Sequence, residues 1–210
     1  GSKTKSDLTS PNTILLHQTL EKIKKKKIEN VIIEASSHGL HQERLHHIDF
    51  KSAVFTNFSQ DHLDYHKNMK AYLNAKLILF RKILRKKTKI ISDKGILPFK
   101  ILKKISKKRG LKLVDINNEF LKVKNQLPAF PDFKKKNLAM GILAAKICGL
   151  KDRLIYGKIK KINDVNGRLE LVKKFPNKVK VFLDYAHTPD ALLKTLECLK
   201  NENKKNIIIV

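Results

Sequence analysis

The fold is indicated by residues 53–66, AVFTNFSQDHLDYH, where an apolar run gives way within a few positions to ionisable side chains. Ala53 to Asn57 has the length and composition of a buried parallel strand. A second apolar run, Val31 to Ile33, is followed by EASSHG at residues 34–39. Ligands of open α/β sheets bind at the carboxyl ends of strands, so both polar runs are candidate sites.

Strand-like and helix-like segments alternate along most of the chain. This alternation predicts an α/β fold with a mostly parallel sheet flanked by helices. The expected strands are residues 31–33, 53–57, 89–92, 111–116, 169–172, 179–184 and 206–210. The expected helices are residues 13–27, 69–86, 96–108, 137–148, 152–161 and 189–200. The pattern restarts near Gly167, so we expect one domain over residues 1–165 and the beginning of a second α/β domain over residues 166–210.

Composition and charge narrow the class of protein. Hydrophobic residues make up 41% of the chain, which supports a packed core, and no run approaches the roughly 18 apolar residues of a membrane-spanning helix. The formal net charge is +27, but only six of the 46 basic residues are arginine, and the chain has no tryptophan. Because the lysines are scattered and lack interleaved aromatic residues, we expect no nucleic-acid binding. A basic polyanion-binding module remains an alternative, and an acidic or phosphorylated substrate suits the charge.

The first two polar runs contain residue types that bind divalent cations. Glu34 and His62 can point into one crevice and share a metal ion. The alternative is structural, with Glu34 capping a turn and His62 hydrogen-bonded in a loop. A metal hydrolase is a further alternative, and its ligands would be Asp61, His62, Asp64 and His66.

A third polar run, DYAHTPD at residues 184–190, also follows an expected strand. Thr188 suits the N-cap of the next helix and Asp190 its first turn, so a helix start alone accounts for the run. The same corner also suits contacts to a nucleotide. The chain contains no GxxxxGK[ST] phosphate loop, GxGxxG fingerprint, GxSxG elbow or HExxH motif.

Four segments taken together resemble the Mur ligases. They are EASSHGL at residues 34–40 with Gln42 and Arg44, FTNFSQDHLDYH at residues 55–66, Ala75-Lys76, and GRLE at residues 167–170 with DYAHTPDAL at residues 184–192. The resemblance is strongest to the members that add the third amino acid of the peptidoglycan stem peptide. It implies a three-domain enzyme, of which this chain holds most of the central ATPase-type domain and the start of the C-terminal domain. The phosphate loop would lie before Gly1, so we expect this excerpt to be inactive alone.

The resemblance implies an ATP- and Mg²⁺-dependent amide ligase of cell-wall synthesis. Its substrates would be UDP-N-acetylmuramoyl-L-alanyl-D-glutamate and either diaminopimelate or lysine, joined through an acyl phosphate. We expect a cytoplasmic monomer. Another amide ligase of the superfamily, such as a folylpolyglutamate or cyanophycin synthetase, is the alternative, which the runs SSHG and DYAHTPD disfavour.

The resemblance also implies roles for individual residues. The implied catalytic residues are Glu34 and His62 as Mg²⁺ ligands and Lys76 as a carbamylated lysine that supports a second Mg²⁺. The implied contacts to the UDP-muramoyl dipeptide are Thr9, Ser10, Ser36, Gln42 and Arg44. The implied contacts to ATP are Asn137, Arg168, Asp184 and His187. One residue departs from the family pattern, since Lys134 stands where the family has an asparagine that contacts adenine.

Overall fold

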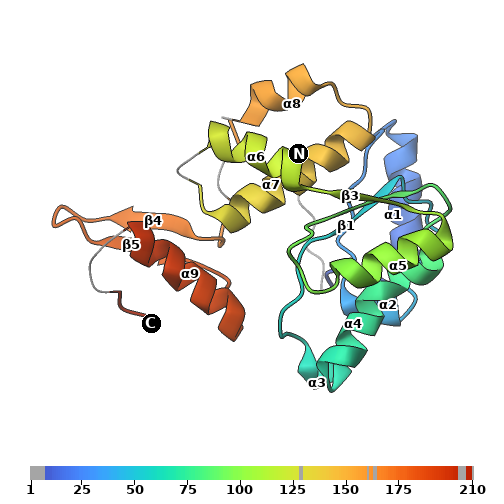
Figure 1. Cartoon of the computed structure of the whole chain (residues 1–210), viewed down its shortest axis with the longest axis horizontal. Coiled ribbons are helices and arrows are strands. Elements are labelled where there is room, and N and C mark those ends of the chain that lie inside the picture. Colours follow the sequence, from blue (N-terminus) through green and yellow to red (C-terminus); the bar gives the residue numbers. More distant parts are fainter. Residues whose placement is uncertain (1–7, 128–129, 160, 163–164, 203–206, 210) are drawn as a thin grey trace. The chain divides into compact units, whose positions relative to one another are not determined.

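The computed structural model describes residues 8–127, 130–159, 161–162, 165–202 and 207–209. The chain divides into two compact units, the first formed by residues 1–58 and 62–150 and the second by residues 59–61 and 151–210. Both units combine helices and strands (Figure 1), so the predicted α/β class is confirmed. The domain boundary expected after residue 165 stays a prediction.

The sheet of the first unit has three parallel strands in the order β1-β2-β3. The strands are β1 (Ser52–Phe55), β2 (Lys89–Ser92) and β3 (Lys112–Asp115). Ile90 and Ile91 are both fully buried although successive side chains of a strand point to opposite faces. The sheet is therefore covered on both faces, which explains why its central strand is an apolar run. The strands expected at residues 53–57, 89–92 and 111–116 are confirmed.

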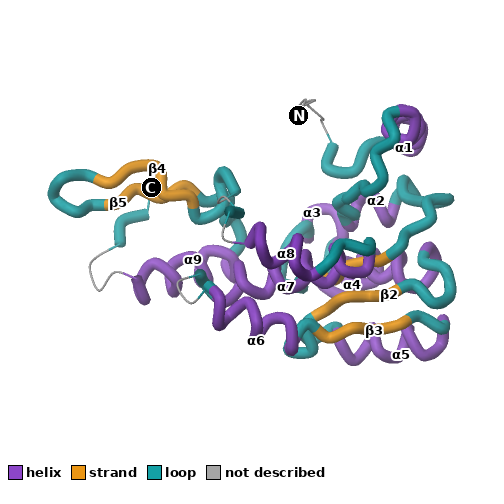
Figure 2. The backbone as a smooth tube through the Cα atoms, turned by 90° about the horizontal axis from the view of Figure 1, so that it is seen from above, coloured by secondary structure: helices purple, strands orange, loops and turns teal. Residues whose placement is uncertain are grey.

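Helices of the first unit pack on both faces of this sheet. The helices of the unit are α1 (Thr13–Lys25), α2 (Ser37–His41), α3 (Leu63–His66), α4 (Met69–Ile78), α5 (Phe99–Arg109), α6 (Asn117–Gln126) and α7 (Asp132–Ile147). The core cluster joins Ile90 to Leu77, Phe80 and Leu102, so α4 and α5 lie over one face. Helix α7 contacts β1 and β2 and also packs against α6. Figure 2 shows α5 running beside β3.

The helix expected over residues 69–86 is shorter than predicted. Asn68 caps α4, its side chain accepting a hydrogen bond from the Ala71 N–H at 2.9 Å. The helix continues as a π-helical turn, η1 (Leu79–Ile83), and the backbone is extended at Leu84. The Arg109 guanidinium donates to the Leu84 carbonyl at 2.6 Å, which gives this helix end a hydrogen-bond donor.

The strand expected at Val31–Ile33 is wrong. In the described part of the chain these residues belong to no helix or strand, and the ladder hydrogen bonds of β1 go to β2. Ile32 is 98% exposed, whereas Ile33 packs against the core cluster. An apolar run becomes a strand only where a neighbouring strand satisfies its backbone groups, and the sequence pattern does not report that neighbour.

Three short helices, α2, α3 and α6, were not expected from the sequence. Two of them lie within the polar runs that mark the candidate site, where apolar periodicity is too short to detect. Helix α7 begins at Asp132, five residues before the expected start at Asn137, and α5 begins at Phe99. These shifts are at element ends, where sequence patterns locate boundaries least well.

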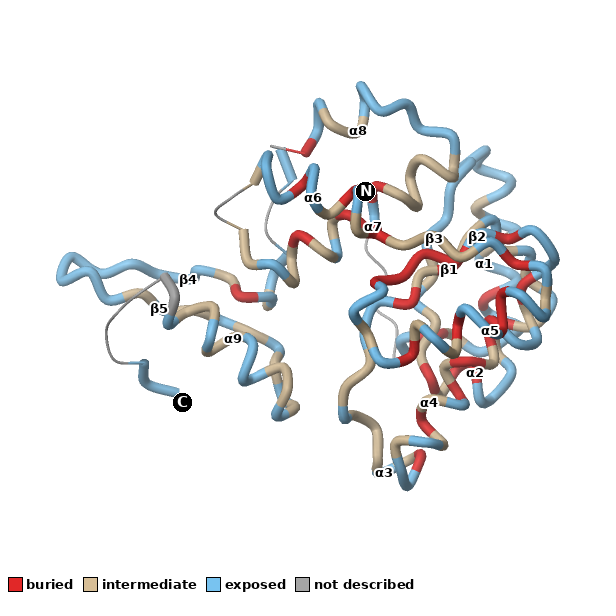
Figure 3. Tube along the Cα trace, in the orientation of Figure 1, coloured by how far each residue is buried: buried red, intermediate tan, exposed pale blue. Residues whose placement is uncertain are grey.

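The second unit contains α8 (Asp152–Ile159), β4 (Glu170–Lys174), β5 (Lys180–Leu183) and α9 (Pro189–Glu202). Strands β4 and β5 pair antiparallel, with a bulge between Leu171 and Lys173. The strand expected at residues 206–210 is not borne out at residues 207–209, and residues 206 and 210 lie outside the described residues. Figure 3 shows buried residues concentrated in the first unit, whereas β4, β5 and α9 are mostly half-buried or exposed.

Candidate active site

Four of the five residues implied as substrate contacts form one hydrogen-bonded cluster. Ser10 is fully buried, and its hydroxyl donates to the Glu34 carbonyl at 2.9 Å and accepts from the Ser36 N–H at 3.2 Å. The Ser36 hydroxyl lies 3.0 Å from that of Ser10 and also accepts from the Gly39 N–H. Since the Ser10 proton is used on Glu34, Ser36 donates to Ser10, and both hydroxyls are satisfied.

Gly39 makes this close approach possible. A Cβ atom at position 39 would lie 2.7 Å from the Ser10 Cβ and 2.8 Å from the Ser10 Oγ. Ser36 is the N-cap of α2, so Gly39 sits in the first turn of that helix, pressed against the Thr9–Ser10 segment. The absence of a side chain at position 39 therefore lets residues 26 positions apart in the sequence, Ser10 and Ser36, share their hydrogen bonds.

Arg44 and Gln42 extend the cluster at the end of α2. The Arg44 guanidinium donates to the Ser10 carbonyl at 2.8 Å and to the side-chain carbonyl of Gln42. The side-chain amide of Gln42 then donates to the Tyr65 hydroxyl at 3.1 Å. Thr9, the fifth implied contact, is exposed next to Ser10. The structure thus gathers the implied substrate residues at one place, although they come from three separate stretches of sequence.

His62 lies at the turn that precedes α3, with a left-handed backbone (φ 54°) that is uncommon for a residue other than glycine. Its ring makes edge contacts with the rings of His38 (4.9 Å between centroids) and Tyr72 (5.8 Å). Lys76, on α4, is half-buried and places its Nζ 4.9 Å from the centroid of the same Tyr72 ring. Two of the three implied metal-site residues therefore meet at Tyr72.

Glu34, the third, is exposed and precedes the N-cap residue of α2 by two positions. Within the described residues, no group of three or more histidine, cysteine, aspartate or glutamate side chains is arranged to hold a metal ion. Asp61, His62, Asp64 and His66, the ligands expected for a hydrolase, do not form such a group among the described residues. The donor types of Glu34, His62 and a carbamate on Lys76 suit Mg²⁺, and two of these side chains already converge on Tyr72.

His66 is a buried structural residue. Its Nε2 shares a 3.0 Å hydrogen bond with the Ser37 hydroxyl, and both side chains are nearly inaccessible. Burial lowers the pKa of His66, and the neighbouring His38, His41 and His62 lower it further, against a smaller opposing effect of Asp64. The hydrogen bond between the neutral His66 ring and Ser37 thus connects the end of α3 to the start of α2.

Asn137 is exposed on α7. Near it, the Lys136 ammonium pairs with Asp93 at 2.6 Å, and Asp93 also accepts from the Gly95 N–H at 2.8 Å. Burial raises the pKa of Asp93, but the hydrogen bonds from Lys136 and Gly95 and the charges of Lys136 and Lys94 outweigh it, so the net pKa is lowered. Sequence reasoning missed Asp93, although its position directly after β2 was an available signal.

The residues implied as nucleotide contacts in the second unit surround one turn. Asp184 accepts hydrogen bonds from the Leu169 N–H at 2.6 Å and the Ala186 N–H at 2.7 Å. The Arg168 guanidinium lies 4.7 Å from the centroid of the Tyr185 ring. His187 is exposed, and its Nδ1 lies 2.9 Å from the Tyr185 carbonyl. We call residues 167–170 and 184–187 the Asp184 turn.

Two family models match most of the chain. The Mur ligase middle domain matches residues 1–141, and the domain described as Mur ligase, glutamate ligase domain matches residues 167–210. The chain therefore belongs to the Mur ligase family.

Individual relatives share one name. This chain is similar to two proteins named UDP-N-acetylmuramoyl-L-alanyl-D-glutamate--2,6-diaminopimelate ligase. The one from Wigglesworthia glossinidia brevipalpis is 36% identical over 97% of this chain and 46% of the relative. The one from Aquifex aeolicus is 34% identical over 98% of this chain and 45% of the relative. A solved structure with the same name aligns with a TM-score of 0.69 at 25% identity, over 90% of this chain and 44% of that one. The chain thus spans less than half the length of these relatives. No helix among the described residues is long and apolar enough to cross a membrane.

Proposed function

We propose that the protein containing this chain is an ATP-dependent amide ligase that joins 2,6-diaminopimelate to UDP-N-acetylmuramoyl-L-alanyl-D-glutamate. The observation that carries this proposal is the cluster of Ser10, Ser36, Gln42 and Arg44 beside the turn that bears His62. The names of the relatives support the choice of substrates. Because the reaction consumes ATP, we propose a cytoplasmic location. We also propose that residues 166–210 begin a second domain.

The proposed reaction has two steps. A γ-carboxylate oxygen of the D-glutamyl residue attacks the γ-phosphorus of ATP, which yields an acyl phosphate and ADP. The neutral amine of diaminopimelate then attacks the acyl carbon, loses a proton, and expels inorganic phosphate as the amide forms. Negative charge accumulates on phosphoryl oxygens in both steps, so cationic groups are expected to dominate catalysis.

The residues of this chain bind and orient the reactants in this proposal. Arg44 uses two of its five N–H donors on Ser10 and Gln42, and the others suit the anionic UDP-muramoyl dipeptide. Glu34, His62 and carbamylated Lys76 would hold Mg²⁺, which screens the phosphoryl charge. Asn137, Arg168, Asp184 and His187 would contact ATP.

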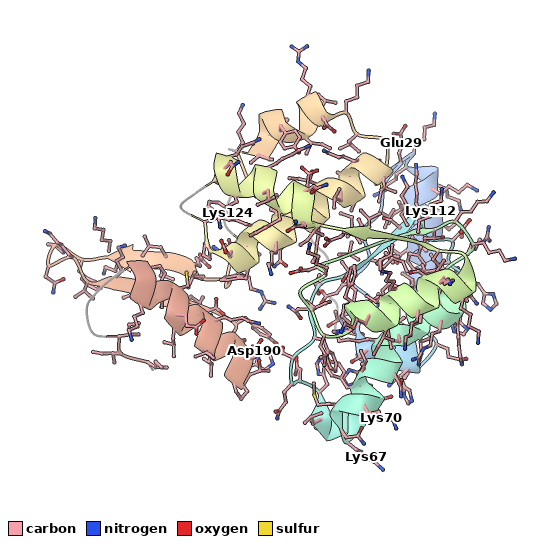
Figure 4. The ribbon with its side chains drawn as sticks, viewed as in Figure 1. Glu29, Lys67, Lys70, Lys112, Lys124 and Asp190 are labelled. Carbon is pink, nitrogen blue, oxygen red and sulfur yellow. The ribbon has the colours of Figure 1, made fainter. Side chains whose placement is uncertain are left out.

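The lysine-rich surface does not favour a polyanion-binding module over this ligase. Figure 4 labels Lys67, Lys70, Lys112 and Lys124, which belong to the end of α3, to α4, to β3 and to α6. These four lysines lie on different elements of the first unit, whereas a nucleic-acid backbone is bound along a continuous basic groove.

The test is an ADP-release assay on the protein expressed from its complete coding sequence. We expect ADP formation to require both the UDP-muramoyl dipeptide and diaminopimelate, and the product mass to equal the sum of the two minus one water. Replacing diaminopimelate with lysine tests the choice of amino acid. ADP release that needs neither acceptor, or a product formed only from a folate substrate, would contradict the proposal.

A further inference from the structure

Tyr65 occupies a junction that none of the implied roles explains. It lies on α3, three residues after His62, and its hydroxyl lies 2.9 Å from His41 Nδ1 and 3.1 Å from the side-chain amide of Gln42. Its ring lies against the rings of His38 (4.2 Å between centroids) and His66 (4.7 Å). The hydroxyl therefore contacts the end of α2, while the ring packs beside the histidines around His62.

The hydrogen bonds at this junction have a defined direction. The Arg44 guanidinium has only donors, so it fixes the side-chain carbonyl of Gln42 toward itself and the amide group toward Tyr65. The Tyr65 oxygen accepts from Gln42 at 3.1 Å and also shares a 2.9 Å hydrogen bond with His41 Nδ1. Arg44 in turn donates to the Ser10 carbonyl at 2.8 Å. A continuous series of bonds thus runs from Ser10 through Arg44 and Gln42 to Tyr65.

The other end of this series reaches His62 through ring contacts. His38 lies between the two rings, with its centroid 4.2 Å from that of Tyr65 and 4.9 Å from that of His62. A shift of the Tyr65 ring would therefore be passed to His38 and from there to His62. All three rings are half-buried, so the shift would be passed through their direct ring contacts.

We propose that Tyr65 is a positioning residue that couples the UDP-muramoyl dipeptide contacts at Gln42 and Arg44 to the orientation of His62. The inference rests on the proposed function. Binding of the dipeptide fixes Arg44, Arg44 fixes Gln42, and Gln42 fixes the Tyr65 hydroxyl and so the ring beside His38. Each hydrogen bond restricts the next group. Ordering of Arg44 and Gln42 by the bound dipeptide therefore favours one orientation of the His62 ring.

The kinetic test is a double-mutant cycle on the protein expressed from its complete coding sequence. Tyr65→Phe keeps the ring and removes the hydroxyl, and we expect it to raise KM for the UDP-muramoyl dipeptide about threefold to tenfold. Gln42→Ala should raise KM similarly, and the double variant should be no worse than Gln42→Ala alone. Tyr156→Phe makes the same chemical change at a tyrosine on α8 and is the control, so its effect on KM should multiply independently with that of Gln42→Ala. A purely structural role would instead lower the thermal midpoint without changing KM.

A second measurement does not depend on activity. In the ¹⁵N NMR spectrum, Tyr65→Phe should shift the side-chain amide signals of Gln42 and the ring signals of His62, whereas Tyr156→Phe should shift neither. Unchanged Gln42 and His62 signals, or KM effects of Tyr65→Phe and Gln42→Ala that multiply, would overturn the coupling. A wild-type protein that makes no amide product would refute the proposed function, and the NMR comparison would still decide whether Tyr65 links the two groups.

Discussion

The two candidate corners of this chain are built in different ways. In the α2–α3 corner, which comprises Ser10, Ser36, Gln42, Arg44, His62 and Tyr65, polar side chains bond mainly to one another and to the Ser10 segment. In the Asp184 turn, one carboxylate bonds two backbone N–H groups, and Leu169 is held with a positive φ of 51°. The first arrangement can respond to a ligand that contacts its side chains, whereas the second mainly fixes the course of the backbone.

The largest effect is expected where the α2–α3 corner meets the proposed metal site. Lys76→Ala and His62→Ala should each lower ligase turnover about 10²- to 10³-fold, because the proposed mechanism assigns both residues to the stabilisation of phosphoryl charge. A short carboxylate such as formate should partly restore turnover to Lys76→Ala if a carbamate is the working group. His17→Ala, an exposed position on α1, is the control and should leave turnover unchanged. If Lys76→Ala and His62→Ala had the same turnover as His17→Ala, Lys76 and His62 would have no role in stabilising phosphoryl charge.

The sequence predicted more of the sheet than of the sites. The strands at residues 53–57, 89–92 and 111–116 were recognisable because burial on both faces leaves a plain apolar signal. The equally apolar run at Val31–Ile33 gave the same signal but forms no strand, since pairing depends on a neighbour that the run itself does not encode.

In the candidate site, too, the sequence predicts residue types but not the contacts between them. A family resemblance predicts Ser10, Ser36, Gln42 and Arg44 as substrate contacts, but the sequence does not predict their mutual hydrogen bonds, which depend on the close approach at Gly39. The roles of Tyr65 and Asp93 were missed, because a tyrosine in a polar run and an aspartate after a strand are common. Only their partners, Gln42 and Lys136, distinguish them.

Removing the carboxylate of the Asp184 turn should destabilise the second unit. Asp184→Ala leaves the Leu169 and Ala186 N–H groups without their acceptor, and we expect the free energy of unfolding to fall by about 2 kcal/mol. Hydrogen exchange at the Leu169 and Ala186 amides should accelerate. Asp190→Ala, at the position labelled on α9 in Figure 4, removes an exposed pair with Lys194 and should change stability by less than about 1 kcal/mol. Similar losses in both variants would mean that the turn is not specially dependent on Asp184.

Filling the space at Gly39 tests the α2–α3 corner by packing instead of charge. Gly39→Ala should lower the free energy of unfolding by about 1–2 kcal/mol and raise KM for the UDP-muramoyl dipeptide, because its methyl group would displace Ser10. Gly141→Ala is the matched control, since a Cβ there meets nothing within 4 Å and alanine favours the helix interior. Thermal unfolding and KM measured on both variants separate the two cases. An unchanged KM in Gly39→Ala would mean that the Ser10 segment does not contact this substrate.

The smallest effect is expected for the pH dependence of stability at Asp93. Like Asp184, Asp93 directly follows a strand and its carboxylate accepts a backbone N–H. Its pKa is lowered in the folded chain, so its contribution is complete above the unfolded pKa near 3.8 and is lost as pH falls through the lower folded pKa. Asp93→Asn should therefore cost on the order of 1 kcal/mol between pH 6 and 8, with a difference from wild type that shrinks below about pH 4. The exposed Asp49, paired with Arg85, provides Asp49→Asn as a control with a smaller effect. A stability difference for Asp93→Asn that stayed constant down to pH 2 would show that the cost does not come from the carboxylate charge, so the ion pair with Lys136 would contribute nothing measurable to stability.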